Sequence, residues 1–144
     1  MALIFREAKL GDVSSIFNFG INDDSFRVSE KIKFYEIEEL SEWVLDKVNN
    51  ILAVAEHNGV VVGFFFCKLM SSHWAFLDNF YLDANFRNDN NGKKMFLFLK
   101  NKLSRRNIKY LSILVESDKK ALIRYSENLG FSKSNKYQWL ELFV

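Results

Sequence analysis

Residues 74–100 constrain the fold more than any other stretch of the chain. Their sequence, WAFLDNFYLDANFRNDNNGKKMFLFLK, predicts an apolar strand, a short polar loop and a helix that begins near Gly92. Another apolar run, residues 109–115, follows that helix. Because a helix separates the two strands, we expect them to lie parallel and to be joined by a right-handed crossover. The free N–H groups and the positive dipole end at the start of such a helix attract phosphate.

The strands before this stretch are predicted to pair in the antiparallel direction. Residues 51–56 and 60–70 are strand-like runs, and Asn58-Gly59 between them favours the positive φ angles of a tight hairpin turn. A hairpin makes its two strands antiparallel, and residues 74–82 continue them as a fourth strand. The sheet is therefore predicted to be mixed and mostly antiparallel.

The remaining pattern completes one globular domain over residues 1–144. Its further elements are a first strand over residues 2–7, a last strand over residues 136–143, and helices that start near Asp12, span residues 34–48 and span residues 119–129. Gly130 follows the last helix and fits a left-handed C-terminal cap. A length of 144 residues with 49% hydrophobic content suits a single domain of the α/β (α+β) class.

Charge and cysteine content argue against several classes of protein. The net charge of +2 is too small to indicate binding to nucleic acid. The single cysteine, Cys67, cannot form an internal disulfide, so no oxidising compartment is needed. The longest uncharged apolar run, residues 60–67, is too short to span a membrane, and Arg6 and Glu7 lie where a signal peptide would need its apolar core. We therefore expect a cytoplasmic protein that binds neither a membrane nor nucleic acid.

Two motifs in the second half of the chain resemble those of one enzyme family. Residues 82–93, LDANFRNDNNGK, resemble the segment Val-x-Pro-x-x-Arg-Gly-x-Gly-x-Gly with which the GNAT superfamily of acyl-CoA-dependent N-acyltransferases binds the pyrophosphate of its cosubstrate. Residues 118–131, DKKALIRYSENLGF, resemble the family's Asn-x-x-Ala-x-x-x-Tyr-x-x-x-Gly-Phe. Both motifs occur in the family's order, and the strand and helix pattern of nearly the whole chain agrees.

The resemblance implies a fold and a cosubstrate. The fold is a single GNAT-type domain whose mostly antiparallel sheet has six to seven strands, splayed between the fourth and the fifth, with about four flanking helices. The cosubstrate is acetyl-CoA, whose pantetheine arm enters between the splayed strands. No metal is expected, because neither His57 nor His73 has a partner that would make it a ligand. The oligomeric state is left open between a monomer and a homodimer.

The resemblance also assigns the contacts to acetyl-CoA. The backbones of Phe80, Tyr81 and Leu82 would hydrogen-bond the pantetheine arm, and the amides from Asn88 to Lys93 would hold the pyrophosphate. The complete set of expected cosubstrate-binding residues is Phe80, Tyr81, Leu82, Arg87, Asn88, Asp89, Asn90, Asn91, Gly92, Lys93, Asp118 and Tyr125.

Three positions depart from the family pattern. Asn88 and Asn90 replace glycines, so two Cβ atoms lie where bare backbone usually approaches phosphate, although asparagine tolerates left-handed φ angles better than most residues. Asp118 replaces an asparagine, and an ionised carboxylate accepts a hydrogen bond but cannot donate one. The alternative interpretation of the loop is a polar, Asn-rich turn that binds nothing.

The catalytic residues are predicted with unequal support. Tyr125 matches the family tyrosine that protonates the departing thiolate, and its helical spacing with Ala121 and Leu129 predicts that it points inward, as a core tyrosine also would. Asp78 is the candidate general base, and strand alternation places it on the same sheet face as Phe80 and Leu82. Glu116 and a chain of water molecules are alternatives for the base, because Ile113 occupies the position of the glutamate found in many relatives.

The sequence thus predicts an N-acetyltransferase that moves an acetyl group from acetyl-CoA to a primary amine of a small molecule or of a protein or peptide. The alternative, favoured by Asn88, Asn90, Asp118 and the absent fifth-strand acid, is a GNAT-like module that binds an acyl-CoA or a partner protein without turnover. A weaker third hypothesis is a basic nucleic-acid module that uses residues 100–109.

Overall fold

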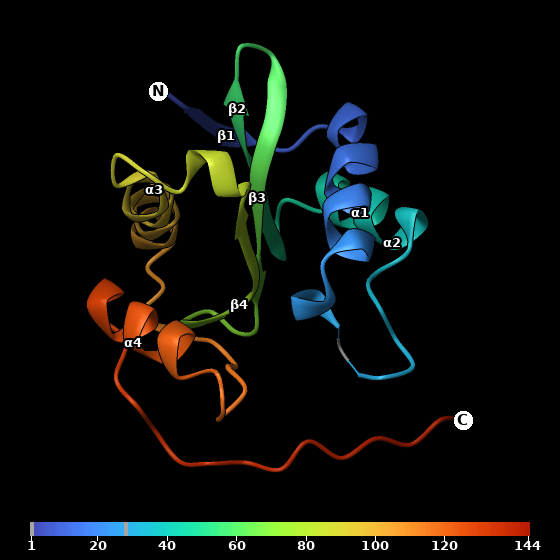
Figure 1. The fold of residues 1–144 in the computed structure, drawn as a ribbon, viewed down its shortest axis with the longest axis vertical. Coiled ribbons are helices and arrows are strands. Elements are labelled where there is room, and N and C mark those ends of the chain that lie inside the picture. Colours follow the sequence, from blue (N-terminus) through green and yellow to red (C-terminus); the bar gives the residue numbers. More distant parts are fainter. Residues whose placement is uncertain (1, 28) are drawn as a thin grey trace. The chain divides into compact units, whose positions relative to one another are not determined.

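The computed structural model describes residues 2–27 and 29–144, which form two compact units, Met1–Ile113 and Leu114–Val144. The first unit contains five strands and three α-helices (Figure 1). In chain order its elements are β1 (Ile4–Glu7), η1 (Leu10–Asp12), α1 (Val13–Asn22), η2 (Asp24–Phe26), α2 (Ile37–Leu45), β2 (Asn50–His57), β3 (Val60–Leu69), β4 (Trp74–Leu82), η3 (Ala84–Phe86), α3 (Asn91–Arg105) and β5 (Tyr110–Ser112). The second unit contains α4 (Lys120–Leu129) and an extended C-terminal segment.

The sheet has the order β1-β2-β3-β4-β5, and every neighbouring pair is antiparallel except β4 and β5. This confirms the mixed, mostly antiparallel sheet and the parallel pair that encloses α3. The β2–β3 turn is also as predicted, because Asn58 and Gly59 have φ angles of +50° and +81°.

The predicted splay lies between β4 and β5. These strands pair only through Trp74–Tyr110, Ala75–Leu111 and Phe76–Ser112, and beyond Phe76 the described residues supply no further β5 partner for β4. Leu77 and residues 79–82 of β4 therefore pair with β3 on one side and have no strand partner on the other side among the described residues.

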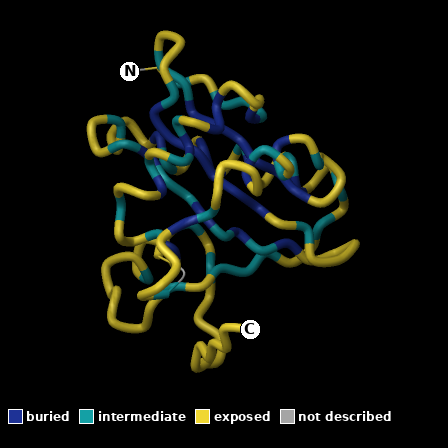
Figure 2. The backbone as a smooth tube through the Cα atoms, turned by 90° about the vertical axis from the view of Figure 1, so that its right-hand side faces the viewer, coloured by how far each residue is buried: buried dark blue, intermediate teal, exposed yellow. Residues whose placement is uncertain are grey.

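The helices of the first unit cover both faces of the sheet. Figure 1 shows α1 and α2 on one face and α3 on the other. Side-chain contacts agree: the rings of Trp43 and Phe66 stack on the α2 side with centroids 4.7 Å apart, whereas Phe65 faces Phe98 of α3 at 6.2 Å. Burial is concentrated in the central strands and in the helix faces turned toward them (Figure 2).

The second predicted helix is shorter than expected. It was predicted over residues 34–48, but α2 begins at Ile37 because the Glu39 carboxylate accepts the N–H of Glu36 and starts the helix there. Phe34 precedes the helix and is nevertheless buried, whereas Val48 follows it and is 79% exposed.

The strand predicted over residues 136–143 is wrong, so the sheet has five strands rather than six to seven. Apolar residues at every second position, such as Tyr137 and Trp139, match the sequence pattern of a strand. A strand also needs a neighbouring edge for its hydrogen bonds, and the structure assigns none of residues 131–144 to a strand. Tyr137 and Trp139 are 79% and 59% exposed.

The end of α4 matches its prediction. Gly130 has a φ of +112°, and its N–H and that of Phe131 donate to the carbonyls of Glu127 and Ser126 at 3.0 and 3.1 Å. This is the left-handed cap that only glycine adopts without strain.

Candidate active site

A β-bulge in β4 determines which face of the sheet carries Asp78. Asn79 pairs with Phe66 and Leu77 pairs with Cys67, so Asp78 is an extra residue without a partner position on β3. The hydroxyl of Tyr35, which lies just before α2, donates a hydrogen bond to the Asp78 carboxylate. Phe80 instead packs against Phe96 of α3, with centroids 6.3 Å apart. The prediction that Asp78 shares a face with Phe80 is therefore wrong, because the bulge breaks the alternation.

The surroundings of Asp78 suit a proton acceptor. Burial raises the pKa of its carboxyl group, while the hydrogen bond from Tyr35 and the charge of Lys68 lower it in part. Burial and the nearby Asp78 charge raise the pKa of Tyr35, so its phenol keeps its proton and acts as the donor. A carboxylate whose pKa lies nearer to neutral pH is a better general base than an exposed one.

The open side of β4 presents backbone groups. The N–H of Asp83 donates to the carbonyl of Val62 on β3 at 2.8 Å. Backbone groups of successive strand residues point alternately to the two neighbouring edges, so the N–H and C=O of Tyr81 point toward β3. Those of Phe80 and Leu82 point away from β3. The Leu82 carbonyl accepts a hydrogen bond from Nε of Arg87 at 2.6 Å. Arg87 also lies 5.6 Å from the centre of the Tyr81 ring. The Arg87 side chain thus holds the loop against the end of β4.

The loop after β4 uses asparagines in conformations that they tolerate. Asn90 and Asp89 have φ angles of +58° and +51°. The side chain of Asn88 is turned into the loop and donates to the carbonyl of Asn85 at 3.2 Å. Asn91 is 1% exposed and its Nδ2 donates to the carbonyl of Phe86 at 3.0 Å. The two asparagines in the glycine positions are therefore accommodated, Asn90 by a left-handed φ and Asn88 by its bond to the loop.

The first turn of α3 offers free donors. The N–H groups of Asn91 and Lys94 donate to the carbonyls of Asn88 and Asn90, both at 2.9 Å. Those of Gly92 and Lys93 have no backbone acceptor among the described residues. The exposed ammonium groups of Lys93 and Lys94 add positive charge at the same helix end.

A hollow of about 370 Å³ opens beside the end of α1. Its lining comprises Asn18, Phe19, Asn22, Asp23, Asp24 and Tyr81. The rings of Phe19 and Tyr81 lie 4.9 Å apart. The Asp23 carboxylate supplies negative charge, whereas that of Asp24 is paired with Arg27 at 3.1 Å. This hollow was not predicted from the sequence, because it depends on how α1 packs against β4.

The predicted residues Asp118 and Tyr125 belong to the second unit. Asp118 is exposed and its carbonyl accepts the N–H of Lys120 at 2.9 Å. Tyr125 is 39% exposed, so the prediction that it points inward is wrong; Ser126 is the buried residue of α4. An argument from helical spacing identifies the buried face of a helix only by the hydrophobicity of its residues. Ser126 is polar but can be buried because its hydroxyl donates to the carbonyl of Leu122 at 2.9 Å. Partial burial raises the pKa of Tyr125.

Two further features bear on the kind of site. Among residues 2–27 and 29–144, no group of three or more His, Cys, Asp or Glu side chains is arranged to hold a metal ion. Within the same ranges no helix has both the length and the apolar character needed to cross a membrane.

Comparison with known proteins identifies the family. A model of the Acetyltransferase (GNAT) family matches residues 18–131, well over half of the chain. The chain belongs to the GNAT acetyltransferase family. No curated protein sequence matches the chain.

Solved structures of GNAT-like fold agree over nearly the whole length. PaiA N-acetyltransferase from Thermoplasma acidophilum, in complex with coenzyme A, has a TM-score of 0.83 and 16% identity over 95% of this chain and 94% of that one. A transcriptional regulator from Bacillus halodurans C-125 has a TM-score of 0.80 and 18% identity over 98% and 100%. AAC(6')-Iy, in complex with the bisubstrate analog CoA-S-monomethyl-acetylneamine, has a TM-score of 0.77 and 12% identity over 100% of both chains. At these identities the likeness concerns the fold.

Proposed function

We propose that this GNAT protein is an N-acetyltransferase that moves an acetyl group from acetyl-CoA to a primary amine of a small molecule or of a peptide. The observation that carries the proposal is the opening of β4 beyond Phe76, which leads directly into the loop and the free N–H groups of α3. An extended pantetheine arm can add its amides to an open strand edge, and a pyrophosphate suits the first turn of a helix.

Acetyl-CoA binding is assigned mainly to the main chain. The backbone groups of Phe80 and Leu82 meet the pantetheine arm, and the side chain of Arg87 shapes the turn that follows. The amides from Asn88 to Lys93 surround the pyrophosphate, whose charge is favoured by Lys93 and Lys94. The family resemblance assigns Asp118, as a hydrogen-bond acceptor, to the pantetheine.

The acetyl group moves by direct attack. The ammonium form of the acceptor gives a proton to the Asp78 carboxylate, and the neutral nitrogen attacks the thioester carbonyl carbon. As the new C–N bond forms and the C–S bond breaks, the departing thiolate takes the phenolic proton of Tyr125, the residue that the family resemblance assigns as general acid. The acetylated nitrogen then loses its second proton, which returns through solvent to the Tyr125 phenolate, so that amide, free thiol and a protonated Asp78 remain. Asp78 has the raised pKa that such a base requires, and Tyr125 has a raised pKa that keeps it protonated.

The acceptor is a cation held on the α1 side of the sheet. Asp23 gives the hollow negative charge, and the faces of Phe19 and Tyr81 suit an alkylammonium group. Structures of the same fold support this class of ligand, since that of AAC(6')-Iy holds an analog that joins CoA to an acetylneamine.

The test has two steps. Thermal unfolding with acetyl-CoA measures cosubstrate binding, which at a hundredfold excess over Kd adds about 2.7 kcal/mol to the free energy of unfolding. Thiol release is then followed with neamine, with a peptide that begins with alanine and with spermidine. Stabilisation by acetyl-CoA with release of thiol supports the transferase. Stabilisation without release for any amine indicates the binding module instead, and absence of stabilisation overturns both.

A further inference from the structure

Tyr35 is held over the sheet by aromatic packing. Its ring meets that of Trp43 edge to face, with centroids 4.7 Å apart at 83°, and lies 5.3 Å from Phe34 and 6.3 Å from Phe66. These contacts restrict the ring to one orientation. Its hydroxyl reaches Asp78, which is 43 residues away in the sequence.

The Asp78 carboxylate would otherwise have little to fix it. Asp78 occupies the bulge position, where the regular side-chain direction of a strand is lost. Its side chain makes no other hydrogen bond to residues 2–27 and 29–144. One carboxylate oxygen thus accepts from the Tyr35 hydroxyl, and the other has no hydrogen-bond partner among the described residues.

We propose that Tyr35 is a positioning residue for acyl transfer, which holds the Asp78 carboxylate on the acceptor side of the sheet with one oxygen directed at the amine. The inference rests on the proposed function. Tyr35 donates its hydrogen bond throughout and does not exchange its proton with substrate. It belongs to the segment between α1 and α2 that also borders the hollow, so one segment positions both the acceptor and the base.

Removal of the hydroxyl has a defined electrostatic consequence. Burial raises the pKa of Asp78, and the hydrogen bond from Tyr35 lowers it by favouring the ionised form. Loss of this hydrogen bond should therefore raise the pKa of Asp78. The other charged groups that act on the pair are Lys68 of β3, toward Asp78, and Glu39 of α2, toward Tyr35. Both remain in a Tyr35→Phe variant.

The test compares Tyr35→Phe with Tyr110→Phe, a control at a ring that is 58% exposed on β5. With the most active amine of the panel, Tyr35→Phe is expected to lower kcat at pH 7 by about three- to tenfold. It should also move the acid limb of kcat/KM to higher pH by about half a unit or more and leave the Kd of acetyl-CoA unchanged. Tyr110→Phe should change none of these.

A second readout separates this inference from the proposed function. The ¹³C shift of the Asp78 carboxyl, assigned by Asp78→Asn, reports its pKa without turnover and should titrate at higher pH in Tyr35→Phe. An active parent enzyme whose pH profile and carboxyl titration are unaffected by Tyr35→Phe overturns the role of Tyr35 alone. A parent that binds acetyl-CoA but acetylates no amine overturns the proposed function and, with it, this role.

Asn79 supports a second inference from a different observation. It is 7% exposed, and its Oδ1 is the one buried side-chain polar atom in the described part of the chain that lacks a hydrogen-bond partner. A buried acceptor without a donor is unfavourable and is rare in folded proteins. Asn79 lies opposite Phe66, so it shares the face of the sheet that carries Tyr35 and Asp78.

We infer that Oδ1 of Asn79 accepts a hydrogen bond from an N–H group of a bound substrate. Two sources carry such a group beside β4, the acceptor amine and the pantetheine amide of acetyl-CoA. Asn79→Leu removes the acceptor but keeps the side-chain volume. The matched control is Asn50→Leu, because Asn50 is 5% exposed on β2 and its Nδ2 donates to the carbonyl of Asp46 at 3.4 Å.

Stability and kinetics should respond in opposite directions. Asn79→Leu is expected to leave Tm unchanged or raise it, whereas Asn50→Leu should lower Tm by a few degrees. Asn79→Leu should also weaken one substrate by about tenfold: a rise in the KM of the amine assigns the bond to the acceptor, and a rise in the Kd of acetyl-CoA assigns it to the pantetheine. A loss of Tm equal to that of Asn50→Leu, or no change in either constant, overturns the inference.

Discussion

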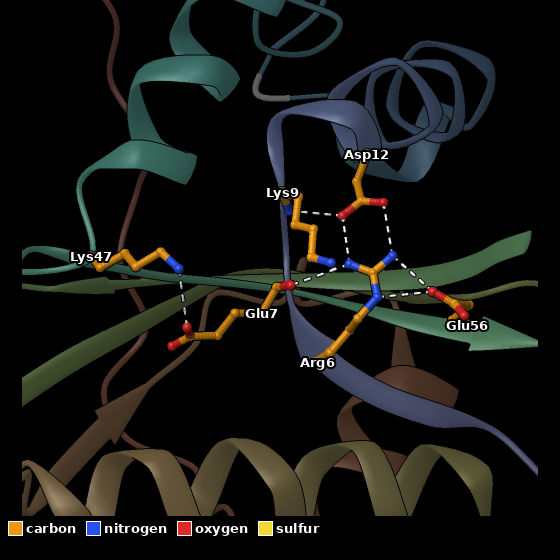
Figure 3. A network of polar contacts seen from close by, with 6 residues as sticks. All are labelled: Arg6, Glu7, Lys9, Asp12, Lys47 and Glu56. Carbon is orange, nitrogen blue, oxygen red and sulfur yellow. Dashed lines mark hydrogen bonds and ion pairs between the residues drawn. The ribbon is translucent and has the colours of Figure 1, made fainter. Parts of the chain in front are cut away.

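Arg6 and Asp12 form a two-pronged ion pair at the start of the first unit. Nη1 and Nη2 of Arg6 donate to the two carboxylate oxygens of Asp12 at 2.7 and 3.0 Å, and Nε donates to Glu56 of β2 at 2.8 Å (Figure 3). Asp12 also accepts the N–H of Lys9 at 2.7 Å. One guanidinium thus ties β1 to β2 and to the turn that leads into α1.

This pair predicts a loss of stability in acid. Burial opposes ionisation of Asp12, but the hydrogen bonds from Arg6 and Lys9 outweigh it and lower its pKa. A carboxyl group whose folded pKa is lowered stabilises the protein above its unfolded pKa, about 3.9, and loses that contribution as the pH falls through the folded value. We expect the free energy of unfolding to be flat between about pH 5 and 7 and to fall below about pH 4, measured by urea unfolding.

Asp12→Asn tests the same relationship at neutral pH. It leaves the half-buried Arg6 without one carboxylate, so we expect a loss of about 2 kcal/mol at pH 7 and a weaker acid dependence. The control is Asp24→Asn, whose partner Arg27 is 3.1 Å away on an exposed surface, with an expected change within about 0.5 kcal/mol. Equal effects of the two substitutions would contradict a special role for the Arg6–Asp12 pair.

Gly20 allows α1 to pack closely on Phe34. A Cβ atom at Gly20 would lie 2.1 Å from Cδ2 of Phe34, a ring that is 6% exposed and packed against Phe26 and Phe64. Because the ring cannot move without disturbing the core, Gly20→Ala should lower the free energy of unfolding by about 1–3 kcal/mol. Gly11→Ala is the control, since no atom lies within 4 Å of its added Cβ. Urea unfolding of both variants checks the difference, and equal stability would rule out the close contact.

Local chemistry predicted those parts of the fold that depend on neighbours in the sequence. The Asn58-Gly59 turn and the Gly130 cap each follow from the backbone preference of one or two residues. The parallel direction of β5 follows from the helix that separates it from β4. These features need no knowledge of distant contacts.

Features set by distant contacts could not be predicted. The bulge that turns Asp78 toward Tyr35 arises because β4 has one residue more than β3 where the two strands pair. Tyr35 and Asn79 were missed because neither lies in a motif, and a buried acceptor without a donor is visible only once the core is packed. The strand expected over residues 136–143 failed for a related reason, because alternation describes a strand but does not supply its partner.

The two asparagines that replace loop glycines should respond differently to restoration of glycine. Asn90 has a φ of +58°, so Asn90→Gly relieves a left-handed conformation and should keep or slightly raise stability. Asn88 is not among the positive-φ residues, and its side chain donates to Asn85, so Asn88→Gly should cost about 0.5–1 kcal/mol. Urea unfolding distinguishes the variants. Greater loss in Asn90→Gly than in Asn88→Gly would contradict the loop conformation.

Tyr125 is expected to act on turnover and not on cosubstrate binding. Its pKa is raised by partial burial above the usual value near 10, so the phenol is protonated at neutral pH and can supply a proton to the thiolate. Tyr125→Phe keeps the ring and removes only that proton, so kcat for thiol release should fall by roughly a hundredfold while the Kd of acetyl-CoA, from calorimetry, stays nearly constant. Tyr137→Phe, at a tyrosine that is 79% exposed, should change neither constant. A weakened Kd with unchanged kcat would make Tyr125 a binding residue, and equal kcat and Kd in variant and parent would remove it from the mechanism.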